Sequence, residues 1–139
     1  MKNHLLTSLI VSAAILSTNA QTYSDDFESY NAGDYIGVNS SSWSTWSNTS
    51  GSSEDTQINT VKANSGTNSL YFSSTAANGG PQDGILSFGG EHDLGAFVFE
   101  TAMFVENGKG GYFNLQKTST AGQVWQVSIN FLQTGVIKF

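Results

Sequence analysis

Apolar and polar residues alternate through much of the second half of the chain. In residues 112–117, Phe113 and Leu115 fall on one face, and residues 124–132 alternate in the same way. The apolar set of this second run is Trp125, Val127, Ile129 and Phe131, and its polar set is Gln126, Ser128 and Asn130. A period of two predicts strands with one apolar and one polar face. Turn residues at 118–122 and 133–135 separate the runs, so the pattern predicts an antiparallel meander.

A continuous apolar run occupies residues 96–105, interrupted by one charge, Glu100. Such a run predicts a central strand that is buried on most of both faces. Shorter strands are expected at 23–30, 43–47, 58–63, 69–73, 85–88 and 136–139, with those at 58–63 and 69–73 on either side of a turn at 64–68. With no helix expected after residue 20, about nine closely spaced strands predict an all-β fold, an antiparallel jelly-roll β-sandwich.

The first twenty residues predict a signal peptide. Lys2 precedes an apolar stretch at residues 5–16, and Thr18 and Ala20 place small residues before an expected cleavage at Gln21. The apolar stretch is shorter than the roughly 20 residues that span a bilayer. The sequence therefore predicts a secreted or cell-surface protein that does not span a membrane, with the folded domain at residues 21–139.

The last predicted strand, residues 136–139, carries apolar side chains and follows a tight turn. An exposed apolar edge is a feature that natural sheets avoid. The sequence therefore predicts the N-terminal portion of a longer jelly roll, truncated at its C-terminus and continued by further domains of a larger exported protein. A complete small sandwich is the alternative.

Composition narrows the choice of partners. Ser, Thr, Asn and Gly supply 60 of the 139 residues, there is no Arg, and the net charge is −6. This charge has the wrong sign for a phosphate backbone, so a nucleic-acid partner is excluded. The small share of charged residues, 12%, excludes a helical bundle.

Several segments carry a family resemblance. Residues 25–36 read DDFESYNAGDYI, residues 43–55 read WSTWSNTSGSSED, residues 65–70 read SGTNSL and residues 110–115 read GYFNL after a glycine. This pattern resembles the concanavalin A-like (laminin G-like) jelly-roll domains of secreted Bacteroidetes proteins of the type IX secretion group. The resemblance implies a jelly roll within a larger protein, and such folds host lectins, glycanases and adhesive modules.

No catalytic residues are predicted. Glycoside hydrolysis needs two carboxyl groups facing one bond. The jelly-roll glucanases place their acids on one strand as Glu-x-Asp-x-Glu or Glu-x-Asp-x-x-Glu, and no predicted strand of this chain carries that pattern. His92 follows Glu91 in a polar turn and reads as a solvated side chain. A glycan-cleaving enzyme whose acids lie beyond residue 139 is the alternative, and a structural spacer is a second one.

Acidic residues early in the chain are candidate calcium ligands. Asp26 and Glu28 share a face if residues 23–30 form a strand, and Glu54 and Asp55 follow a loop that could close the site. The sequence thus predicts a structural calcium ion on these four carboxylates. A solvated acidic edge is the alternative.

A polar sheet face and two tryptophans are candidate carbohydrate ligands. If the strands at 112–117 and 124–132 pair, one face presents adjacent hydroxyl and amide side chains. The predicted glycan-binding residues are Tyr112, Asn114, Gln116, Gln126 and Asn130, with Trp43 and Trp46 as stacking platforms. Trp125 is expected in the core. The sequence therefore predicts a secreted non-catalytic binding module for carbohydrate or a cell-surface partner.

Overall fold

The computed structural model describes residues 23–73, 81–90, 92 and 95–139, so the predicted signal peptide lies outside the described residues. Within these residues, antiparallel strands make up most of the regular structure, and the helix content is a single four-residue element. The all-β prediction is therefore confirmed. The elements are α1 (Ile36–Asn39), β1 (Trp43–Thr45), β2 (Gln57–Asn59), β3 (Ser69–Tyr71), β4 (Gly84–Leu86), β5 (Gly111–Gln116), β6 (Trp125–Phe131) and β7 (Ile137–Lys138).

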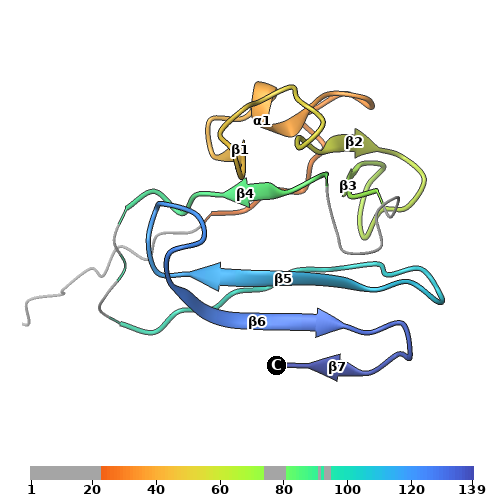
Figure 1. Cartoon of the computed structure of the whole chain (residues 1–139). Coiled ribbons are helices and arrows are strands. Elements are labelled where there is room, and N and C mark those ends of the chain that lie inside the picture. The colour runs from red at the N-terminus through yellow and green to blue at the C-terminus, as the bar shows by residue number, and fades with distance from the viewer. Residues whose placement is uncertain (1–22, 74–80, 91, 93–94) are drawn as a thin grey trace, which may run out of the picture.

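Three antiparallel groups of strands build the chain. β2 pairs with β3, β1 pairs with β4, and β5, β6 and β7 form a three-stranded sheet in that order. The meander β5–β6–β7 and the hairpin β2–β3 confirm the sequence predictions. In Figure 1, β4 lies between the α1 region and β5. The long-range pairing of β1 with β4 therefore holds the loop that follows β1 close to the β5–β6 sheet.

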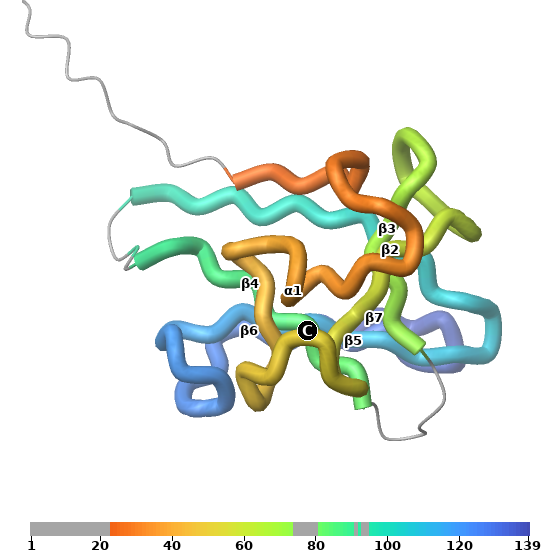
Figure 2. The backbone as a smooth tube through the Cα atoms, turned by 90° about the horizontal axis from the view of Figure 1, so that it is seen from above, coloured from red at the N-terminus to blue at the C-terminus, as the bar shows by residue number. Residues whose placement is uncertain are grey.

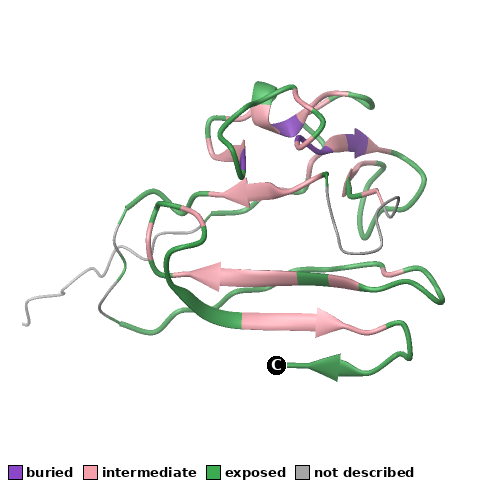
Figure 3. Cartoon of the chain, viewed as in Figure 1, coloured by how far each residue is buried: buried purple, intermediate pink, exposed green. Residues whose placement is uncertain are grey.

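Burial is concentrated in the first half of the chain. Among the described residues, the fully buried hydrophobic side chains are Ile36 of α1 and Ile58 of β2. Backbone bonds join these two regions, with the amide of Ile36 donating to Thr56 at 2.9 Å and that of Ile58 donating to Asp34 at 2.9 Å. Figure 3 shows buried segments only around α1, β1 and β2, whereas β7 is exposed. The described core is therefore small and lies apart from the largest sheet.

The helical turn α1 corrects the prediction that no helix follows residue 20. The amide of Ser40 donates to the carbonyl of Ile36 at 2.9 Å, and the Asn39 side-chain amide donates to the carbonyl of Tyr35 at 2.9 Å. These bonds close one turn over the buried Ile36. Burial of the Ile36 side chain in the tertiary structure thus stabilises this helical turn. The four-residue stretch has no apolar period from which a helix could be predicted.

Residues 23–30 do not form the predicted strand. The Asp25 carboxylate accepts a bond from the amide of Phe27 at 3.0 Å, and the Asp26 carboxylate accepts one from the amide of Glu28 at 3.1 Å. Phe27 has φ of 65°, a left-handed conformation. Aspartates that bind the amide two residues ahead stabilise turns at the expense of strand pairing. Asp26 and Glu28 consequently do not share a strand face.

The predicted central strand at residues 96–105 is also wrong. Within the described part of the chain, no backbone hydrogen bond pairs this segment with a strand, and its side chains are exposed except for the half-buried Val105. The segment lies along β5 through side chains, because Phe99 and Phe113 have ring centroids 5.4 Å apart and Val105 lies close to Gly111. Figure 2 shows it as an extended stretch. A strand buried on both faces needs covering layers that the described residues do not supply.

A β-bulge changes which residues of β6 share a face. Leu115 lies opposite Val127, but the next residue of β5, Gln116, lies opposite Trp125, so Gln126 is an extra residue in β6. Directly opposed side chains project to the same face. Trp125 therefore leaves the apolar face of Val127, where strict alternation placed it, and joins the face of Gln116.

Candidate functional site

Two tryptophans stack at the junction between the β1–β4 pair and the β5–β6 sheet. Trp46, which directly follows β1, and Trp125, the first residue of β6, have ring centroids 6.1 Å apart and an interplanar angle of 26°. Trp46 is 40% exposed and Trp125 is 48% exposed. The expectation that Trp125 belongs to the core is therefore wrong, because the bulge carries it out of the apolar face.

A polar hollow of about 340 Å³ lies beside the Trp46 ring. It is formed where the end of β1 and the following loop meet β4 and the loop between β5 and β6. Its lining residues are Ser44, Thr45, Trp46, Asn48, Ile85, Ser119, Thr120 and Ala121. One aromatic ring surrounded by hydroxyl and amide groups makes this hollow the candidate binding site.

Gly122 fixes the position of the Trp46 ring. A Cβ atom at this position would lie 2.7 Å from Cζ2 and 2.8 Å from Cη2 of the indole, and Gly122 has φ of 81°. Both the close approach and the left-handed backbone require glycine. Its amide also donates to Oε1 of Gln116 at 2.6 Å, which ties the loop to β5.

Gln116 connects this loop to the polar face of the sheet. Its side-chain amide donates to Oδ1 of Asn114 at 2.9 Å while its carbonyl oxygen accepts from Gly122. Tyr112 lies opposite Asn130 and Asn114 lies opposite Ser128, so these side chains share one face as predicted. Gln126 occupies the bulge. The predicted roles of Tyr112, Asn114, Gln116, Gln126 and Asn130 in binding glycan stay predictions, and none of these residues lines the hollow.

The loop that carries Trp46 is held by backbone and carboxylate contacts. The amide of Trp46 donates to the carbonyl of Asp83 at 3.2 Å, and the amide of Asp83 donates to the carbonyl of Glu54 at 2.8 Å. The Glu54 carboxylate accepts bonds from the amide of Ser47 at 2.9 Å and from its hydroxyl at 2.7 Å. These contacts order the residues that follow β1 before any ligand arrives.

Three ionisable groups near this loop have shifted pKa values. The hydroxyl and amide of Ser47 stabilise the charged form of Glu54 and lower its pKa. Burial, and then the charge of Glu54, raises the pKa of Asp83. Burial and the charge of Asp83 raise the pKa of Tyr112. The charge that links them places Tyr112 of β5 near Asp83, the residue that precedes β4.

Trp43 has a different environment from Trp46. Its indole N–H donates to Oδ2 of Asp25 at 3.2 Å, and its ring centroid lies 6.2 Å from that of Phe27. Asp25 also accepts from the hydroxyl of Tyr23 at 3.1 Å, and burial together with this carboxylate raises the pKa of Tyr23 to about 12. The structure thus places Trp43 against the N-terminal segment and outside the hollow.

The four predicted calcium ligands occupy separate places. Glu28 accepts bonds from the amides of Thr67 and Asn68, and Glu54 binds Ser47 as described. Asp55 is buried among backbone amides, and Asp26 binds the amide of Glu28. Among the residues that the structure describes, no three His, Asp or Glu side chains form a group that could hold a metal ion. The structure does not bring these four carboxylates together, and the calcium ion stays a prediction from the sequence.

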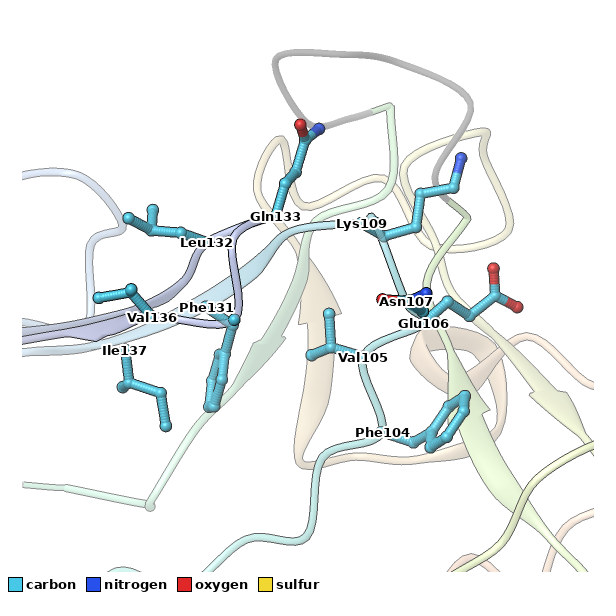
Figure 4. A pocket seen from close by; sticks show the side chains of 12 residues that line it. Phe104, Val105, Glu106, Asn107, Lys109, Phe131, Leu132, Gln133, Val136 and Ile137 are labelled. Atoms are coloured by element: carbon cyan, nitrogen blue, oxygen red, sulfur yellow. The ribbon is translucent and has the colours of Figure 1, made fainter.

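A second hollow, of about 480 Å³, lies between the turn that precedes β5 and the β6–β7 hairpin. Figure 4 shows Val105 and Phe131 facing each other across it. Phe104, Leu132, Val136 and Ile137 add apolar surface, and Lys109 and Gln133 add polar groups. This hollow has no aromatic stack and differs from the first in its largely apolar lining.

Sequence reasoning missed the residues that complete the polar hollow. Ser44 lies in β1, and Asn48, Ser119 and Thr120 lie in loops, all within Ser- and Thr-rich stretches that look like ordinary surface. In the sequence, the loop after β1 and the loop between β5 and β6 are far apart. The β1–β4 pairing and the bulge bring them together in the structure. The glycine at 122, at the end of a turn, is the one local signal of a close approach.

No protein-family model, curated protein or solved structure matches this chain. In the described residues, no helix has the length and apolar character needed to cross a membrane. The hollow and its surroundings are therefore the features of the structure that bear on function.

Proposed function

We propose that this chain is a secreted, non-catalytic module that binds carbohydrate in the hollow beside Trp46. The observation that carries the proposal is the partly exposed Trp46 ring, stacked on Trp125 and bordered by hydroxyl and amide side chains. The resemblance of residues 25–36 and 43–55 to exported jelly-roll domains, among which lectins occur, agrees with this function.

The chemistry of the hollow suits a sugar ring. The apolar C–H face of a pyranose packs on an indole, while its hydroxyls both donate and accept hydrogen bonds. Ser, Thr and Asn side chains also both donate and accept, so they match hydroxyls in either role. Trp125 supports the Trp46 ring from one side, which limits the freedom that the ring loses when a sugar binds.

The test is retention on a glycan array with matched variants. Trp46→Ala removes the stacking surface and should abolish retention, or weaken it by at least about fivefold, since aromatic contacts of this kind are worth roughly 1–3 kcal/mol. Tyr71→Ala removes an exposed aromatic of β3 that does not line the hollow, and should bind normally. Circular dichroism checks that both variants fold. Equal retention by Trp46→Ala and the native chain contradicts the proposal.

We also propose that the strands form part of a larger jelly roll. Phe104 and Ile137 are exposed and line the largely apolar hollow of Figure 4, which lies beside β7. The occupant that fits is a further strand of the same exported polypeptide, paired with β7 and placing apolar side chains over this surface. The intact mass of the protein secreted by its native host tests this proposal. A mass equal to residues 21–139 contradicts it.

The calcium prediction has a direct test. If a calcium ion stabilises the secreted protein, a chelator should lower the melting temperature by several degrees, because a ligand that binds only the folded state adds to its stability. Added calcium should restore the melting temperature, and added magnesium is the control. An unchanged melt contradicts the prediction.

A further inference from the structure

The lining of the polar hollow is uncharged. Among the residues that form it, the polar groups are the hydroxyls of serine and threonine and one asparagine amide, and the rest are Trp46, Ile85 and Ala121. Lys117 precedes the loop from β5 to β6 but does not line the hollow. A ligand in the hollow would therefore meet dipoles and an aromatic ring, with no formal charge among the lining side chains.

Two acidic residues contact the loop that carries Trp46. Asp83 and Glu54 are linked by backbone bonds to this loop, and Glu54 is fixed on Ser47, directly beside Trp46. The whole chain has a net charge of −6 and no arginine to form a bidentate pair with a carboxylate or sulfate. An anionic ligand would thus lose hydration without gaining a counter-charge from the lining.

We infer that the hollow selects neutral glycans and excludes glycans that carry uronic acid or sulfate groups. The inference rests on the proposed carbohydrate-binding function and adds the class of ligand. Hydroxyl groups of a neutral sugar match the lining in both donor and acceptor roles, and the aromatic ring supplies the apolar contact. A carboxylate or sulfate offers only acceptors and needs donors of positive charge that the lining lacks.

The experiment compares immobilised neutral polysaccharides with anionic ones. Galactomannan, xyloglucan and laminarin form the neutral set, and alginate, polygalacturonate and carrageenan form the anionic set. We expect Trp46-dependent retention within the neutral set, unchanged between low and high salt because no ion pair contributes. We expect no Trp46-dependent retention of the anionic set at either salt concentration.

A charge placed in the lining provides a sharper test of the inference. Ser119 is exposed in the loop, and Ser119→Lys adds a cation at the edge of the hollow, while Ser119→Gln is the neutral control of similar reach. Ser119→Lys should increase retention of alginate by about three- to fivefold at low salt, an effect that high salt removes. Ser119→Gln should leave alginate retention at the native level.

The outcomes separate the two proposals. Trp46-dependent retention of alginate or carrageenan by the native chain overturns the ligand class and leaves the binding function standing. No Trp46-dependent retention of any polysaccharide overturns the binding function, and the ligand class with it. Equal alginate retention by Ser119→Lys and Ser119→Gln shows that charge at the hollow does not control selection, and overturns the electrostatic basis of the inference.

Discussion

Asp55 joins three stretches of backbone through one buried carboxylate. Its Oδ1 accepts bonds from the amides of Gly37 at 3.0 Å and Thr56 at 2.9 Å, and its Oδ2 accepts one from Gly51 at 2.8 Å. The residue is 1% exposed. A Cβ at Gly37 would lie 2.9 Å from Oδ2, so glycine at this position allows the close approach. The carboxylate thus serves as a structural acceptor for α1 and the loop after β1.

Replacing Asp55 by alanine should be strongly destabilising. The change leaves three amide groups without their acceptor, of which that of Thr56 is buried, and each buried unsatisfied group costs about 1–3 kcal/mol. We expect a loss of about 2–3 kcal/mol in the free energy of unfolding, measured by urea denaturation. Asp26→Asn alters an exposed carboxylate with one local bond and should change stability by less than about 1 kcal/mol. Similar losses in both variants would refute the role of Asp55.

Asp83 gives the chain a pH-dependent stability of known sign. Burial and Glu54 raise the pKa of Asp83 above its ordinary value of 3.8, so the folded state disfavours the charged carboxylate. The contribution of Asp83 is fully present below 3.8 and is lost as the pH rises through the raised pKa. The Asp83→Asn variant cannot ionise at this position, and should therefore be more stable than the native chain at pH 7. As the pH falls, its stability should rise less than that of the native chain.

Thermal melts of the native chain and of the Asp83→Asn variant, from below pH 3.8 to pH 7, measure this difference in stability. A second readout follows from Tyr112, whose pKa is raised by burial and by the charge of Asp83. Removing that charge should let the Tyr112 hydroxyl ionise at lower pH, which ultraviolet titration of tyrosinate detects. A stability difference between the two proteins that does not vary with pH would count against this assignment.

At the scale of elements, the extended segment at residues 96–105 lies beside β5 without pairing. Met103 and Val105 lie near Gly111, and Phe99 packs between Phe88 and Phe113, with centroids 6.3 Å and 5.4 Å away. These contacts fix its course along the edge of the sheet. Within the described residues its backbone groups are left to solvent, as they are in an edge strand before a partner pairs with it.

Hydrogen exchange should distinguish this segment from its neighbour. Amides in residues 96–105 should exchange rapidly, because they make no backbone bonds to the described residues, whereas inward-bonded amides of β6 should be protected by pairing with β5 and β7. Mass spectrometry of peptides covering the two regions measures the difference. Protection of residues 96–105 equal to that of β6 would show that the segment is a paired strand.

Most of the large apolar side chains that are exposed in the described residues belong to the second half of the chain. Val98 is 84% exposed and Phe139 is 92% exposed, whereas the fully buried hydrophobic residues of the described chain are Ile36 and Ile58. Exposed apolar surface on this scale marks an interaction face or the inside of a larger fold. It supports the proposal that further strands of the exported protein cover the β5–β7 side.

Residues 21–139 produced alone should therefore bind a hydrophobic dye and self-associate. We expect enhanced fluorescence of anilinonaphthalene sulfonate and a concentration-dependent elution volume, both reduced in the full exported protein. A charged substitution within the exposed segment, Val98→Lys, should reduce self-association, and Val38→Lys, the same change at an exposed position of α1, is the control. A monomer that binds no dye would contradict the proposed cover.

The sequence by itself determined the all-β class, the meander β5–β6–β7 and the hairpin β2–β3. Alternation and turn residues are local signals, and neighbouring antiparallel strands need only a short connection to pair. Local pattern also placed Tyr112 and Asn130 on one face. The local pattern could not show that Asp25 and Asp26 make turns. An aspartate side chain can bind the backbone amide two residues ahead, and this bond competes with strand formation in a segment whose composition suits either structure.

Only the tertiary structure decided where the candidate site lies. One inserted residue, Gln126, moved Trp125 to the other face of β6, and the long-range pairing of β1 with β4 brought Trp46 against it. Neither event leaves a periodic signal, since a bulge breaks the period and β1–β4 pairing depends on residues some forty positions apart. The roles of Trp43 and Asp55 likewise followed from their neighbours in space, because a side chain's function depends on what surrounds it.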